Sequence, residues 1–176
     1  AFGTGEHPTT QLCLEWLHTV VSMLLLKQEQ DVTILDYGAG SGILGMGACA
    51  MGHRVSAVGI DIDVDACRIA NANAEANDLP MRSYLPPLIE TDDDESKSLL
   101  LKAHAYASAQ NVTEDLILPN ANDIQYNICV ANILAAPLVA LAPTLLRMIR
   151  PGGYLGMSGI LPQQGKTVAE AYQKAG

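Results

Sequence analysis

The stretch DYGAGSG, residues 36–42, decides the fold of this chain. A short β-branched run at 32–35 precedes it, and an apolar helical pattern at 43–51 follows it. Such a run is typical of a buried parallel strand, and glycines at alternate positions permit a tight turn directly into a helix. We therefore predict a strand, a glycine turn and a helix in this order, with Gly52 closing the helix.

The same strand–helix unit recurs along the chain. Alternation of this kind is typical of a mostly parallel twisted sheet with right-handed crossovers. The predicted fold class is therefore α/β, a Rossmann-like fold with helices on both faces of the sheet. Further strands are predicted at 55–60, 126–130 and 154–157, helices at 9–27, 65–77 and 138–149, and a turn at 151–153.

Length and composition are those of a globular protein. The 176 residues are 49% apolar and 16% charged, which is enough apolar material for a buried core. The formal charge of −9 argues against direct binding to nucleic acid or to a membrane surface, and it permits a basic partner. Because the chain opens on Ala1 and a loop-like sequence, we interpret residues 1–176 as a single domain cut from a longer protein.

Most of the negative charge lies in one segment. Residues 83–123 hold eight acidic residues and two lysines, and they separate the predicted helix 65–77 from the next predicted strand. Connections of this length are unusual within a compact domain. We predict an acidic surface insertion at about 83–123, with a short helix at 99–109 and a short strand at 116–118.

Neither a membrane span nor a metal site is expected. The apolar run 128–146 is long enough to cross a bilayer, but Asn132 and two prolines divide it into a strand and a helix. The four cysteines form no CxxC pair, and no second ligand stands at a suitable spacing from His7. Buried, reduced thiols are favoured, which suits a cytoplasmic protein and leaves an organelle open.

The residues around the glycine turn indicate the kind of ligand. Dinucleotide-binding turns prefer the spacing GxGxxG, whereas here Gly38, Gly40 and Gly42 alternate, so a nicotinamide oxidoreductase is disfavoured. Asp36 precedes them, and its carboxylate would repel a pyrophosphate and attract a cationic amino group. S-adenosyl-L-methionine carries such a group beside its sulfonium. We therefore assign Asp36, Gly38 and Gly40 to this cofactor.

Polar residues end two of the other predicted strands. Asp61 follows the second strand, 23 residues after Gly38, where an acid accepts hydrogen bonds from ribose hydroxyls. Asn132 ends the third strand, and ligands of open α/β sheets bind at the carboxyl ends of strands. We assign Asp61 to the ribose and Asn132 to the cofactor or to a substrate amine. A solvated Asp61 and a turn-forming Asn132 are the plainer alternatives.

Four blocks of the chain resemble the PrmA family, methyltransferases that modify the eleventh protein of the large ribosomal subunit. Many methyltransferases share the glycine block, so the opening block and the ANIL block carry most of the resemblance. Two departures are Glu6, where the family usually has Thr, and Ala39, where Cys is common. The blocks are AFGTG, HPTT and LCL within 1–14, residues 36–44, GIDID at 59–63, and ANIL, LAP, PGG and 155–161.

The resemblance implies an S-adenosyl-L-methionine-dependent N-methyltransferase acting on lysine or N-terminal amines of a basic ribosomal protein. It also implies a separate substrate-gripping domain outside this chain. Asn132, with Thr4 and Thr10 in support, is the residue we assign to the chemistry. By the resemblance, the cofactor contacts fall on Thr10, Gly38, Asp61 and Asn132, under an opening loop of Phe2, Gly3, Thr4 and Gly5.

Two other functions remain open at this point. One is a methyltransferase of the same fold that acts on another protein lysine or on a small molecule. The other is a non-catalytic module that binds the cofactor. In the opening block, Thr9 or Thr10 is also explained as a helix cap, and His7 as a structural residue.

Overall fold

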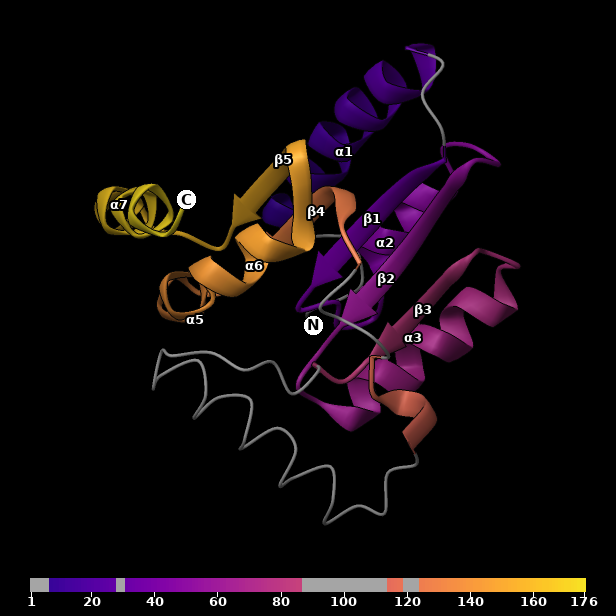
Figure 1. Cartoon of the computed structure of the whole chain (residues 1–176). Coiled ribbons are helices and arrows are strands. Elements are labelled where there is room, and N and C mark those ends of the chain that lie inside the picture. Colours follow the sequence, from indigo (N-terminus) through magenta and orange to yellow (C-terminus); the bar gives the residue numbers. More distant parts are fainter. Residues whose placement is uncertain (1–6, 28–30, 87–113, 119–123) are drawn as a thin grey trace.

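A five-stranded parallel sheet forms the centre of the molecule (Figure 1). The computed structural model describes residues 7–27, 31–86, 114–118 and 124–176. Within these ranges the strand order is β3-β2-β1-β4-β5, so the predicted α/β fold with a parallel sheet is confirmed. The strands are β1 (Val32–Tyr37), β2 (Val55–Ile60), β3 (Met81–Tyr84), β4 (Tyr126–Asn132) and β5 (Ile149–Ser158).

The chain changes direction across the sheet between β1 and β4. Strand β1 pairs with β2 on one side and with β4 on the other, so that Asp36 lies opposite both Gly59 and Val130. The chain builds outward from β1 through β2 to β3, and then builds outward on the other side through β4 to β5. Ligands of doubly wound sheets bind at such a switch point, at the carboxyl ends of the strands.

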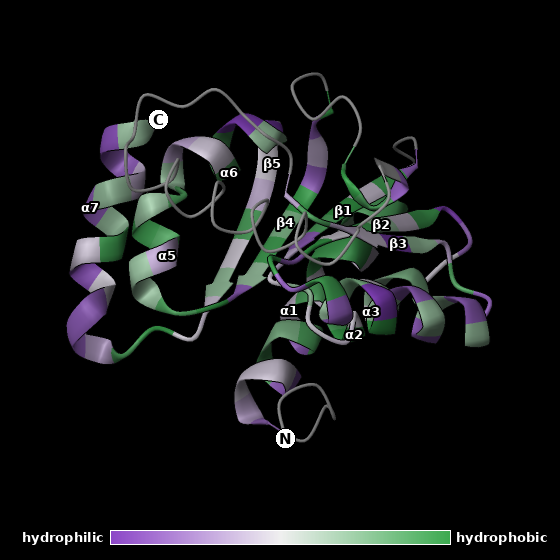
Figure 2. Ribbon diagram, turned by 90° about the horizontal axis from the view of Figure 1, so that it is seen from below, coloured by the Kyte–Doolittle hydropathy of each residue, from purple (hydrophilic) through white to green (hydrophobic). Residues whose placement is uncertain are grey.

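Helices cover both faces of the sheet, as predicted. Figure 2 shows α1, α2 and α3 on one side of the strands and α5, α6 and α7 on the other. Leu17 and Ile34 belong to the core of the first side, and Leu35 and Leu138 to that of the second. The helices are α1 (Pro8–Leu26), α2 (Ile43–Cys49), α3 (Val64–Ala76), α5 (Ala135–Ala140), α6 (Ala142–Met148) and α7 (Gly165–Ala175).

Helix α1 packs against α2 and the sheet. The N-cap of α1 is His7, whose side chain accepts the N–H of Thr9. Pro8 occupies the first turn, where a backbone N–H has no partner within the helix, so its absence carries no cost. Leu17, Val21 and other apolar side chains at helical spacing are buried. Among the described residues, α1 is the helix long and apolar enough to cross a membrane, a property shared by core helices of soluble proteins.

The segment between β4 and the end of β5 differs from its predicted form. The single helix expected at 138–149 is two helices, because the chain breaks at Leu141 and Pro143 lies in the first turn of the next one, which begins at Ala142. The turn expected at 151–153 lies inside β5, where pairing with β4 skips several residues and Gly152 has a φ of +77°. Because residues on both sides of this bulge pair with β4, the strand runs from Ile149 to Ser158, past the predicted boundaries 154–157.

The described residues of the predicted insertion, 83–86 and 114–118, contribute to the core. Ser83 lies in β3, a strand that the sequence analysis missed, and Leu85 pairs through a bridge with Ile117. Leu85 and Leu118 are buried, and Glu114–Leu116 forms a short 3-10 helix. The helix expected at 99–109 lies outside the described residues. All four cysteines are buried free thiols, as predicted.

Candidate active site

The glycine turn between β1 and α2 is held against β2. The N–H groups of Gly38 and Ala39 both donate to the carbonyl oxygen of Ile60, at 2.7 and 3.0 Å. Gly38, Gly40 and Gly42 have φ angles of +78°, +55° and +82°, the left-handed region that glycine adopts without strain. The turn therefore depends on glycine at all three alternate positions.

A hollow of about 100 Å³ opens between the glycine turn and the end of β4. Residues from α1, from the turn with the start of α2, and from β4 surround it. A side-chain carbon at Gly40 would meet no atom within 4 Å, so the turn leaves open space here. The lining residues are Thr10, Gly38, Ala39, Gly40, Ser41, Ile43, Leu44 and Asn132.

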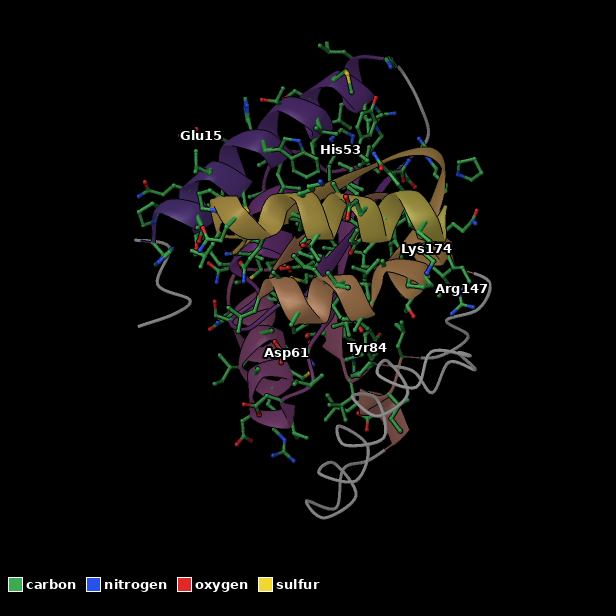
Figure 3. The ribbon with its side chains drawn as sticks, turned by 90° about the vertical axis from the view of Figure 1, so that its left-hand side faces the viewer. Glu15, His53, Asp61, Tyr84, Arg147 and Lys174 are labelled. Atoms are coloured by element: carbon green, nitrogen blue, oxygen red, sulfur yellow. The ribbon has the colours of Figure 1, made fainter. Side chains whose placement is uncertain are left out.

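Asp61 is hydrogen-bonded to Gly40, one of the residues that line this hollow. Its Oδ2 accepts the N–H of Gly40 at 2.8 Å, and its Oδ1 accepts the N–H of Asp63 at 3.0 Å. Its own N–H donates to the carbonyl oxygen of Tyr84 at 3.0 Å, and Figure 3 shows Asp61 and Tyr84 at the same end of the molecule. The carboxylate is thus oriented, and its oxygens retain capacity to accept from hydroxyl groups.

Asp36 lies beneath the glycine turn and is absent from the lining of the hollow. Its carboxyl group is buried, and Oδ2 accepts the N–H of Gly45 at 2.9 Å. Burial raises the pKa of this carboxyl to about 7; the bond from Gly45 lowers the pKa and the charge of Asp61 raises it. Asp36 therefore ties β1 to α2, and its contact with a cationic ligand stays a prediction.

The first turn of α1 meets the end of β4 beside the hollow. The side-chain amide of Asn132 donates from Nδ2 to Oγ1 of Thr9 at 3.4 Å, and the same Oγ1 lies 2.7 Å from Nδ1 of His7. Thr10, the next residue, is buried and lines the hollow. His7 rather than either threonine is the N-cap of α1, so the threonines are free of the capping role considered for them.

The structure thus brings together residues assigned from distant parts of the sequence. Thr10, Gly38, Gly40 and Asn132 surround one hollow, and Asp61 contacts its wall. The sequence analysis missed Ile43 and Leu44 as lining residues, although their position directly after the glycine turn is a signal. It also missed the contact of Thr9 with Asn132, for which the sequence holds no signal. Phe2, Gly3, Thr4 and Gly5 lie outside the described residues.

A second, larger hollow of about 350 Å³ lies between α5 and α7. None of its lining residues comes from the glycine turn or from a strand, and none was singled out by the sequence. Its size does not make it the better candidate, because ligands of doubly wound sheets bind at the switch point of the strand order, where the glycine turn lies. Its lining residues are Ala135, Ala136, Val139, Gln163, Gln164, Thr167 and Val168.

Replacement of Gly38 by alanine is expected to destabilise the fold. At a φ of +78° a side chain is strained, and the added methyl group would collide with the side chain of Ile133. We expect the free energy of unfolding in urea to fall by about 2 kcal/mol or more. The control is Gly165→Ala, because Gly165 has a helical φ of −57° and open space around it. Equal stability of the two variants would contradict this account of the turn.

Among solved structures, the chain is similar to a ribosomal protein L11 methylase from Lactobacillus delbrueckii subsp. bulgaricus. The TM-score is 0.64 at 24% identity, over 97% of this chain and 70% of that one. It is also similar to a SAM-dependent methyltransferase from Agrobacterium tumefaciens, with a TM-score of 0.59 at 13% identity, over 97% of this chain and 51% of that one. The fold is therefore that of the S-adenosylmethionine-dependent methyltransferases.

Sequence comparison is more specific. The chain is 42% identical over 172 residues to the ribosomal protein L11 methyltransferase of Pseudomonas putida, covering 98% of this chain and 46% of that protein. It is 42% identical over 177 residues to that of Pseudomonas fluorescens, covering 99% and 47%. The model of the ribosomal protein L11 methyltransferase (PrmA) family matches residues 1–176, and the chain belongs to this family. It spans about half the length of these relatives.

Proposed function

We propose that this chain binds S-adenosyl-L-methionine at the hollow and transfers its methyl group to lysine or N-terminal amines of ribosomal protein L11. Membership of the family supports the reaction and the substrate. The observation that carries the proposal is the convergence of the glycine turn, Thr10 and Asn132 on one hollow, with Asp61 bonded to its wall. These groups come from the carboxyl ends of three adjacent strands and from α1.

The residues around the hollow fit this cofactor. Gly40 leaves space for close approach of a ligand to the backbone, and Asp61 offers carboxylate oxygens to a ribose diol. Asp61 places a carboxylate beside the turn, which disfavours a pyrophosphate and favours a ligand with positive charge, and Asp36 adds negative charge only as pH rises through about 7. When bound, the cofactor supplies a methyl group already activated by a sulfonium.

The main contribution of the protein is then to position the methyl group and the acceptor amine and to exclude water from them. We assign the anchoring of the sugar to Asp61, the apolar wall to Ile43 and Leu44, and the orientation of the acceptor amine to Asn132. None of the residues that line the hollow within the described part of the chain is ionisable. We propose that the proton of the acceptor ammonium is lost to solvent, with no general base among the described residues of the lining.

The opening loop completes the proposed site. From the family resemblance we assign Phe2, Gly3, Thr4 and Gly5 to the methionine end of the cofactor, with Thr4 supporting Asn132. The acidic balance of the chain, −9, suits a basic protein substrate, and direct nucleic-acid or membrane partners are not part of the proposal. We place the protein in the cytoplasm and leave an organelle open.

Titration of the protein with S-adenosyl-L-methionine, S-adenosylhomocysteine and NADH in a calorimeter tests the cofactor. We expect the first two to bind and NADH not to bind; the reverse preference would overturn the proposal.

The substrate is tested with methyl-labelled cofactor and purified L11, followed by mass spectrometry of its peptides. We expect label on lysine or N-terminal amines. Label on other proteins or small amines alone, or binding without transfer to any acceptor, would support the two alternative functions instead.

A further inference from the structure

The side chain of Asn132 has a partner from the opposite end of the chain. Asn132 is the last residue of β4, and its Nδ2 donates to Oγ1 of Thr9 in the first turn of α1. Both residues are held by the fold, because Asn132 pairs with Ser158 of β5 and Thr9 follows the capped start of α1. The contact therefore joins two fixed elements beside the hollow.

The hydrogen bonds of Thr9 have a defined direction. Nδ1 of His7 accepts the N–H of Thr9 at 3.3 Å. The hydroxyl oxygen of Thr9 lies 2.7 Å from the same nitrogen, and with Nδ1 as the acceptor the hydroxyl is the donor of this contact. What remains on Oγ1 is acceptor capacity, which matches the amide donor of Asn132 at 3.4 Å.

This direction bears on which end of the Asn132 amide can face a ligand. One N–H of the amide is engaged by Thr9, and in this orientation the carbonyl oxygen Oδ1 can face the hollow that Asn132 lines. An amide oxygen accepts an N–H of a neutral amine and leaves the nitrogen lone pair free to attack. A reversed amide would present a donor, which would compete for that lone pair.

We infer that Thr9 is a positioning residue, which orients Asn132 so that its oxygen faces the acceptor amine. The inference rests on the proposed function, because it needs an amine acceptor beside Asn132. It adds to that function a role for Thr9, which sets the orientation of the Asn132 side-chain amide. His7 acts one step further away, by accepting a hydrogen bond from the hydroxyl of Thr9.

Three variants on α1 separate orientation from stability. Thr9→Val removes the hydroxyl and keeps the shape, and Thr9→Ser keeps the hydroxyl. Thr19→Val is the matched control, because the Thr19 hydroxyl donates at 3.0 Å to the carbonyl oxygen of Glu15 on the exposed side of the same helix. The side-chain NH₂ signals of Asn132, assigned by their loss in Asn132→Ala, are followed by NMR without any substrate. Cofactor affinity is measured by calorimetry, and kcat and KM with L11 as acceptor.

We expect Thr9→Val to shift the Asn132 NH₂ signals and to lower kcat about tenfold, the effect of losing one hydrogen bond. The KM for the cofactor and its affinity should stay within about twofold, Thr9→Ser should recover kcat, and Thr19→Val should match the wild type. Unchanged NH₂ signals in Thr9→Val would overturn the inference, as would a kcat equal to that of the wild type. Wild-type protein that binds no S-adenosyl-L-methionine contradicts the proposed function itself, and calorimetry detects this before any variant is compared.

Discussion

Asp61→Ala is expected to weaken binding of S-adenosyl-L-methionine on the order of 100-fold, because it removes two hydrogen bonds between a carboxylate and the ribose diol. It also removes the acceptor for the N–H of Gly40, so the wall of the hollow loses an anchor. The dissociation constant is measured by calorimetry at constant ionic strength. The dissociation constant of Asp61→Asn should fall between those of the wild type and Asp61→Ala, since the amide oxygen of asparagine replaces one of the two acceptors.

The control for Asp61 is Asp65→Ala. Asp65 lies near Asp61 in the chain, and its carboxylate forms an exposed ion pair with Arg68 at 3.1 Å. Exposed pairs of this kind contribute little, so the variant reports the loss of one negative charge alone. We expect its affinity to remain within about twofold of the wild type. Similar affinities for Asp61→Ala and the wild type would exclude the ribose assignment.

Asp36→Asn is expected to make the folded protein more stable at pH 8. The carboxyl group of Asp36 is buried with one hydrogen bond, and burial raises its pKa from 3.8 to about 7 in the folded state. The folded protein thus holds a proton that the unfolded chain releases above pH 4. The stability from this group is complete below the unfolded pKa and is lost as pH rises through about 7. This loss is on the order of 4 kcal/mol.

Denaturation in urea between pH 4 and pH 8 tests this expectation. The free energy of unfolding of the wild type should fall relative to Asp36→Asn across this range, because the variant keeps the acceptor for Gly45 without the charge. The curves should converge near pH 4 and separate most above pH 7. Asp65→Asn is the matched exposed control and should run parallel to the wild type. Parallel curves for Asp36→Asn would mean that the charge of Asp36 is solvated in the folded protein.

The main elements could be predicted because their signals are local. The β-branched run at 32–35, the alternating glycines after it and the apolar helical patterns each lie within a few residues, and the structure has a strand, a turn and helices there. The assignment of Asp61 followed from its place after a strand. Predicted boundaries were less accurate. β3 was missed because its four residues, Met81–Tyr84, adjoin a polar loop and carry no long apolar run.

Distant contacts decided the features that the sequence did not indicate. Leu141 breaks a long apolar helical pattern into α5 and α6, and Pro151 lies within β5 because β4 provides a partner strand on either side of the bulge. Thr9 and Asn132 are 123 residues apart and meet because α1 packs across the sheet end. Local propensity cannot report a contact whose partners are brought together only by the packed sheet.

The sequence by itself determined the class of fold and the glycine turn, and it indicated the acids that we assign to a cationic nucleotide ligand. These are properties of neighbouring residues, since backbone freedom and charge at a turn need no distant partner. Only the tertiary structure decided that Asp36 lies beneath the turn while Asp61 bonds to its wall, and that Thr9 engages the amide of Asn132. Burial and hydrogen-bond direction depend on which elements pack together, and that follows from the order of the strands in the sheet.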